Sequence, residues 1–136
     1  MKVALGLGCD RGTPAATVGA AIAGALAACG RTLADVGAVA SIDLKADEPA
    51  LAELAAAHGW TIRFYAAAQL AAVTVPNPSE TVRKYTGTPS VAEAAALLAA
   101  GHGDTATAPA RLLIEKHKLR GADGRNATVS IARMSP

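Results

Sequence analysis

The sequence predicts an α/β protein, a single three-layer α/β/α domain over residues 1–136 whose mixed sheet ends in a C-terminal antiparallel hairpin. Over two-thirds of the chain, short apolar runs typical of buried strands alternate with longer runs typical of helices. Most of the helical runs begin at a capping residue or a proline. Two apolar runs near the C-terminus are joined only by a Gly/Asp-rich connection, which favours antiparallel pairing.

The first elements are a strand, a tight loop and a helix. The apolar run 3–5 predicts a buried strand, and the three glycines of the loop 6–12 permit sharp turns and close approach of a ligand. Thr13 is predicted to cap the helix that extends over 15–29, with Pro14 at its first position. Such a loop presents free N–H groups and the positive end of a helix dipole. It is therefore a candidate anion site, and a tight turn without a ligand is the alternative.

The middle of the chain repeats this alternation. Asp47 is predicted to cap the next helix, with Glu48 in its first turn, because carboxylates satisfy the free N–H groups there. The predicted elements are, in order, a strand over 36–42, a polar turn over 43–48, a helix to about residue 58, a strand over 61–65 and a short helix over 67–72.

The last part of the chain begins with two more helices. Asn77 is predicted to cap a short helix that ends near Tyr85, and Ser90 with Glu93 forms a capping box for a helix that ends at Ala100. The remaining predicted elements are a loop over 101–109, strands over 112–116 and 127–132, and a long connection over 119–126 between these strands.

Composition limits the classes of function. The formal net charge of +2, from 13 basic and 11 acidic residues, is too small for a nucleic-acid interface, and aromatic residues are only 3% of the chain. The most apolar helix, 15–29, is shorter than a membrane span, and two cysteines make no disulfide framework. We therefore expect no nucleic acid and no membrane as partner, and a location in the reducing cytoplasm.

Three polar turns, around Cys9, Lys45 and Ser79, follow apolar runs in the order expected of parallel strands. Because the carboxyl ends of parallel strands meet at one edge of a sheet, these turns are expected to assemble one site. Arg125, in the hairpin connection, is expected to lie far from it. The candidate binding residues are Gly8, Cys9, Arg11, Gly12, Thr13, Asp43, Lys45, Glu48, Asn77, Ser79 and Glu80.

Two residues are candidates for catalysis. Cys9 precedes a helix N-terminus and lies beside Arg11, which predicts a lowered thiol pKa, although no His/Asp partner for a nucleophile is visible nearby. A small apolar-like residue in a tight loop is the alternative for Cys9. Glu48 is a candidate general base, with the amides of residues 8–12 as oxyanion donors. A solvated charge cluster is the alternative for residues 43–48.

Cofactor motifs are weak or missing. The glycines of the first loop are spaced one residue away from the dinucleotide fingerprint, and no acidic residue ends the second strand at the expected interval. A nucleotide-binding oxidoreductase is therefore a weak alternative, and the chain has no phosphate loop for ATP or GTP. The cysteines and histidines are not at metal-ligand intervals. No cofactor and no metal is expected.

Four spaced motifs carry a resemblance to a known family. The stretches GLGCDRGT, ASIDLKADEPAL, VPNPSETV and GTPSVAEAAALLAAG, followed by the closing EKHK and ATVSIAR, resemble CobE and the C-terminal domain of CbiG, which are cobalamin-biosynthesis proteins. The likeness extends over nearly the whole length of the chain. At Asp10 the sequence departs from the family, which more often has a second basic residue there.

The resemblance implies a role in corrin-ring biosynthesis. A precorrin-type tetrapyrrole is the implied ligand, and other enzymes of the corrin pathway are candidate partners. Because precorrins carry many acetate and propionate carboxylates, a site of helix N-termini with Arg11 and Lys45 suits them chemically. The favoured function is to bind such an intermediate or assist its conversion. The alternative is CbiG-like hydrolysis, in which a ring lactone is opened and a two-carbon unit is lost, so whether the chain is an enzyme stays open.

Overall fold

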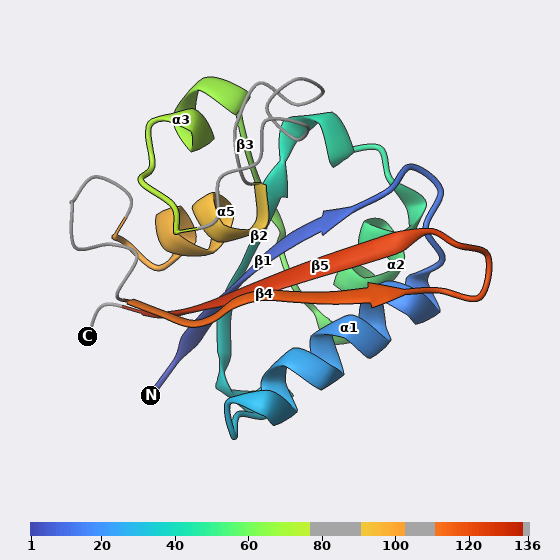
Figure 1. The fold of residues 1–136 in the computed structure, drawn as a ribbon, viewed down its shortest axis with the longest axis horizontal. Helices are drawn as coiled ribbons and strands as arrows, with labels where there is room; N and C mark the ends of the chain where they lie inside the picture. Colours follow the sequence, from blue (N-terminus) through green and yellow to red (C-terminus); the bar gives the residue numbers. More distant parts are fainter. Residues whose placement is uncertain (77–90, 103–110, 135–136) are drawn as a thin grey trace.

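Five strands form one mixed sheet at the centre of the molecule (Figure 1). The computed structural model describes residues 1–76, 91–102 and 111–134. In the sheet order β3-β2-β1-β5-β4, the first three strands are parallel, and β5 is antiparallel to both β1 and β4. The strands are β1 (Val3–Cys9), β2 (Val36–Ile42), β3 (Arg63–Tyr65), β4 (Leu112–Arg120) and β5 (Asn126–Arg133). The predicted mixed sheet with a C-terminal antiparallel hairpin is confirmed.

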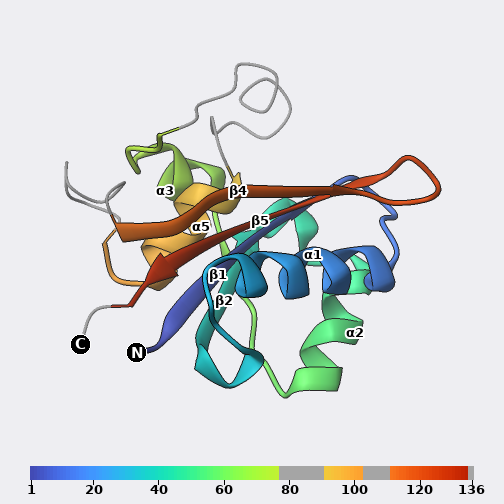
Figure 2. The same ribbon diagram turned by 60° about the horizontal axis from the view of Figure 1, so that its bottom comes forward.

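Helices cover both faces of the sheet, which gives the predicted three layers (Figure 2). Two helices, α1 and α2, pack on one face, and α3 and α5 pack on the other. Their bounds are α1 (Ala15–Ala28), α2 (Pro49–His58), α3 (Ala67–Ala71) and α5 (Val91–Ala99). Two short 3₁₀ turns, η1 (Leu33–Asp35) and η2 (Asp43–Lys45), flank β2.

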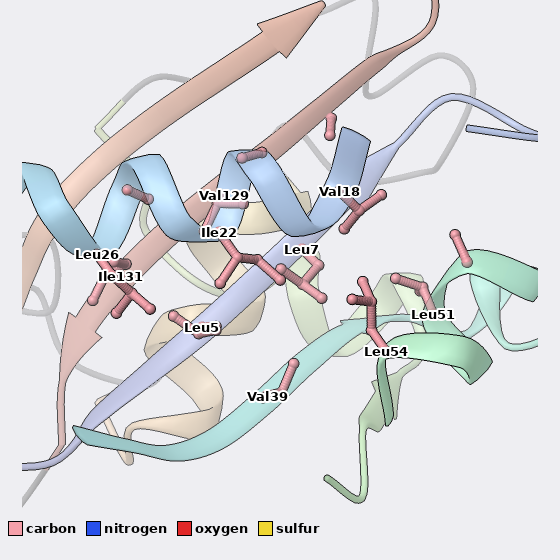
Figure 3. Packing of buried hydrophobic residues seen from close by; sticks show 14 of the residues in the cluster. Leu5, Leu7, Val18, Ile22, Leu26, Val39, Leu51, Leu54, Val129 and Ile131 are labelled. Atoms are coloured by element: carbon pink, nitrogen blue, oxygen red, sulfur yellow. The ribbon is translucent and has the colours of Figure 1, made fainter. Parts of the chain in front are cut away.

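The core under α1 consists mainly of branched aliphatic side chains (Figure 3). Val18, Ile22 and Leu26 recur every fourth residue along α1, so they form one apolar stripe that faces the sheet. Beneath them lie Leu5 and Leu7 of β1, which are no more than 1% exposed. Each such side chain contributes about 1.5–3 kcal/mol through burial, so this face supplies much of the stability.

Where α5 packs on β1, the core is built instead from very small residues. On this face of β1 the side chains are Ala4 and Gly6, and both are covered by the helix. A Cβ atom at Gly6 would lie 1.8 Å from the backbone oxygen of Ala92 and 2.6 Å from the backbone nitrogen of Ala96. The backbone of α5 therefore rests directly on β1, and only glycine fits between them.

This packing corrects the predicted first loop. Gly6 and Gly8 belong to β1, where they pair with Ser130 and Thr128 of β5, so the strand extends to Cys9. The pattern was misleading because glycine usually marks a turn, whereas the requirement at Gly6 is close helix packing. The loop begins only after Cys9.

Two predicted helix caps are wrong, although the helices start close to the predicted positions. Pro14 and not Thr13 holds the N-cap position of α1, because the Thr13 hydroxyl donates to the Asp10 carbonyl at 2.6 Å. Glu48 and not Asp47 is the N-cap residue of α2. At the far end, α2 stops at His58 as predicted, and the glycine that follows has a φ of 70°.

Most of the remaining boundaries differ from the predicted ones by a few residues. The range of β2 is the one predicted, whereas β3 begins at Arg63, two residues later than predicted. The helix α1 ends at Ala28, one residue early, and α3 also ends one residue early. In the hairpin both strands are longer than predicted, which shortens their connection to 121–125. The helix predicted from Asn77, the cap at Ser90 and most of the loop 101–109 lie outside the described residues.

Candidate functional site

Two of the three predicted polar turns lie side by side where β1 and β2 end, an edge of the sheet that we call the carboxyl edge. Arg11, in the loop after β1, joins the turns by donating to the Asp47 carboxylate and to the Leu44 carbonyl, each at 2.7 Å. The third turn, with Asn77, Ser79 and Glu80, lies outside the described residues.

The anion position of the first loop is filled by the chain's own Glu48. Its Oε1 accepts the Gly12 N–H at 2.8 Å, and its Oε2 lies 3.2 Å from the Arg11 guanidinium. The Glu48 side chain is only 1% exposed. This carboxylate therefore acts as an internal ligand of the loop, and it is poorly placed to serve as the general base considered above.

Other amides of the first loop are also engaged. The Asp10 N–H donates to the Asn126 carbonyl at 2.9 Å, and the Thr13 N–H donates to the Asp10 carbonyl at 3.1 Å. Thr13 itself is 2% exposed. The amides of Asp10, Gly12 and Thr13 thus stabilise the loop, and they are not free to bind an oxyanion in this conformation.

The tip of the C-terminal hairpin packs against the same loop (Figure 1). The Asp10 carboxylate accepts the Asn126 backbone N–H at 2.7 Å and its side-chain amide at 3.2 Å. Arg125 donates from Nε to the Arg11 carbonyl at 3.1 Å. The expectation that Arg125 is distant is therefore wrong, because the hairpin is long enough to reach the carboxyl edge. The carboxylate of Asp10 thus supports this contact.

Cys9 ends β1 with its half-buried side chain against the core of the α1 face. Burial raises the pKa of its thiol, and the positive charge of Lys45 opposes this only in part. The predicted lowering of the pKa is wrong, because desolvation has the largest effect and the negative charge of Glu48 raises the pKa further. These surroundings fit the alternative in which Cys9 is a small packing residue.

Among the described residues, Lys45 is a cation at the carboxyl edge that remains available to a ligand. It ends η2 and is partly buried, and among the described residues its ammonium has no hydrogen-bond or ion-pair partner. Arg11, in contrast, is already paired with a carboxylate. Its hydrogen bond to Asp47 raises the Arg11 pKa and lowers the Asp47 pKa. Asp43 is exposed at the start of η2.

The backbone around Gly8 leaves open space at the same edge. A Cβ at Gly8 would meet only Thr128, at 4.0 Å, whereas Gly6 is covered by α5. A small hollow of about 170 Å³ separates the starts of α1 and α2, but Glu48 and Glu53 line it. That hollow is too small and too acidic for a carboxylate-rich tetrapyrrole.

A comparison with known protein families shows to which family the chain belongs. The profile described as "Cobalamin synthesis G C-terminus" matches residues 3–132, nearly the whole chain. The chain belongs to this family.

Curated relatives agree with the CobE/CbiG resemblance. The cobalt-precorrin-5A hydrolase of Priestia megaterium is 40% identical over 99 residues, which are 73% of this chain and 26% of that protein. Protein CobE of Sinorhizobium sp is 50% identical over 101 residues, which are 71% of this chain and 64% of the relative. The chain thus spans less than two-thirds of the length of either relative.

Solved structures of the CobE/CbiG family share the fold. The crystal structure of CobE, a protein from the cobalamin (vitamin B12) biosynthetic pathway, is 34% identical with a TM-score of 0.78, covering 98% of this chain and 91% of that one. Cobalamin biosynthesis protein chiG from Agrobacterium tumefaciens str. C58 is 31% identical with a TM-score of 0.65, covering 98% and 99% of the two chains.

Two features are absent from the described residues of this CobE/CbiG-family chain. None of their helices has the length and apolar character needed to cross a membrane. No group of three or more His, Cys, Asp or Glu side chains among them could hold a metal ion.

Proposed function

We propose that this CobE/CbiG-family chain binds a precorrin-stage tetrapyrrole at the carboxyl edge and assists its conversion. Membership of the family and the corrin-pathway names of its relatives support the ligand class. The observation that carries the site is Lys45, a partly buried cation with no acidic partner among the described residues. A peripheral carboxylate of the tetrapyrrole would supply that partner.

Within this proposal, Lys45 contacts the ligand and Arg11 positions the turn that carries Lys45. Arg11 already binds the Leu44 carbonyl and two carboxylates, so it has little capacity left for a ligand. This division revises the expectation that both cations bind directly. It also removes support for a nucleotide site, because the glycine spacing of β1 is explained at Gly6 by the packing of α5.

Titration with hydrogenobyrinic acid, followed by its visible absorbance, tests the proposal. Lys45→Ala should weaken binding about tenfold or more, since hydrogen bonds to charged groups contribute about 1.5–3 kcal/mol. The matched control is Arg133→Ala, an exposed cation at the end of β5 that lies beside the start of β1, at the end of the sheet opposite the carboxyl edge. Added salt should also weaken binding. Equal affinity of the parent and Lys45→Ala would refute the role of Lys45, and no binding to the parent would refute the ligand class.

A second candidate function is hydrolysis of a cobalt-precorrin. It is favoured by the 40% identity with a protein named cobalt-precorrin-5A hydrolase, although the chain spans only 26% of that protein. The buried, paired Glu48 gives this reaction little support as its base. Incubation with cobalt-precorrin-5A distinguishes the two functions by mass spectrometry: hydrolysis removes a two-carbon unit, whereas binding leaves the mass of the ligand unchanged.

A further inference from the structure

A second open feature lies at the opposite end of the sheet, where β2 begins. A groove of about 440 Å³ extends between the first half of β2, Val36–Val39, and the segment 59–63 that leads into β3. We call it the edge groove. Its lining includes Trp60 and Arg63, and no acidic residue lines it among the described residues.

The groove exists because β3 is too short to cover β2. The pairing of β3 involves only Ala40, Ser41 and Ile42 of β2, so the described structure pairs the first half of β2 with β1 alone. The cause lies at the end of α2: the left-handed Gly59 and the bond from the Trp60 N–H to the Ala55 carbonyl hold the chain to the helix. The segment therefore reaches the sheet only at Arg63.

An uncovered strand edge presents backbone N–H and C=O groups in the pattern that another strand would bind. Four residues of strand extend about 13 Å, enough to pair with a peptide of similar length. Trp60 offers an apolar surface. Its ring stacks on the ring of His58 with centroids 4.5 Å apart, which fixes the orientation of the Trp60 side chain. Arg63 is exposed and has no ion-pair partner among the described residues.

We propose that the edge groove binds an extended, acidic peptide segment of a partner protein, which adds to β2 as a further strand. The backbone of Val36–Val39 would supply the main-chain hydrogen bonds, as in other cases of strand addition. Trp60 would pack against an apolar side chain of the peptide, and Arg63 would pair with an Asp or Glu. This surface is independent of the tetrapyrrole site, which lies at the other end of the same strands.

Selection from a phage-displayed random heptapeptide library tests the proposal, with fluorescein-labelled synthetic copies of the enriched peptides for affinity measurement. Enriched peptides should combine Asp or Glu with β-branched residues. Arg63→Glu and Trp60→Ala should each weaken their binding about tenfold or more. Hydrogen exchange should slow at amides of 36–39 when a peptide is bound. Lys118→Glu, on β4 at the opposite side of the sheet, is the charge-matched control and should bind like the parent.

Several outcomes would overturn the proposal. They are the absence of enriched acidic peptides, equal binding to parent and Arg63→Glu, and exchange that is unchanged at 36–39. Thermal unfolding of each variant separates loss of binding from loss of folding, and a variant that is unfolded is replaced by Arg63→Gln. A concentration-dependent dimer that Arg63→Glu dissociates would assign the groove to a second copy of the chain instead of a peptide.

Discussion

Replacing Gly6 by alanine tests the close contact between β1 and α5. The new Cβ would lie 1.8 Å from the Ala92 oxygen, and real Cβ contacts essentially never fall below 3.0 Å. The helix would have to move by more than 1 Å, because the obstructing atoms are backbone and cannot rotate away. Overpacking of a core typically costs 1–3 kcal/mol, and a rigid backbone obstacle places Gly6→Ala at about 3 kcal/mol or more.

Gly8→Ala is the matched control for this prediction. It lies on the same strand and the same face, and its Cβ would meet only Thr128 at 4.0 Å. Its stability should therefore change by less than about 1 kcal/mol. Urea unfolding followed by circular dichroism measures the free energy of unfolding of both variants. Thermal unfolding provides a second measurement, because for a chain of this size a loss of 3 kcal/mol lowers Tm by roughly 9–15 °C. Equal unfolding midpoints for Gly6→Ala and Gly8→Ala would refute the inferred packing.

Three further predictions concern the carboxyl edge. Glu48→Ala should lose about 1–3 kcal/mol in urea unfolding because it leaves the Gly12 N–H unsatisfied, whereas Glu48→Gln should lose less. Since burial raises the Cys9 pKa and Lys45 lowers it, iodoacetamide should alkylate Cys9 slowly at neutral pH, and more slowly still in Lys45→Ala, as measured by mass spectrometry. The lowered pKa of Asp47 stabilises the fold above the unfolded value near pH 4, and this contribution is lost as pH falls through the folded pKa. Asp47→Asn should therefore show a weaker fall in Tm below pH 4, and an unchanged acid dependence would contradict the ion pair.

Features that depend on neighbouring residues could be predicted from the sequence. The bounds of β2 follow from one apolar run, and the end of α2 follows from the glycine after His58. The layer order followed from alternation of strands and helices, since such alternation has few solutions. These signals are local or repeat along the chain, so a single sequence displays them.

Features that depend on distant residues could not be predicted in this way. Gly6 contacts Ala92, and Glu48 fills the loop at Gly12, 36 residues earlier. Nothing in the composition of the loop shows that its anion is supplied from within the chain. The candidate residues themselves were found from the rule that parallel strands share an edge, which brought the turns of Cys9 and Lys45 together. What the rule could not supply was which of their charges are already paired.

The central position of β1 has a consequence for how the chain folds during synthesis. One neighbour of β1 is β2, but the other is β5, and the pair Val3–Arg133 spans 130 positions. At ribosomal rates of about 5–20 residues per second, synthesis of the chain between β1 and the end of β5 takes on the order of ten seconds. Until then the N–H and C=O groups on that edge of β1 have no strand partner, and Asp10 lacks its hydrogen bonds to Asn126. The contact between Asp10 and Asn126 therefore forms only after a further 116 residues have been made, later than the contacts of Arg11 and Gly12 with residues 44–48.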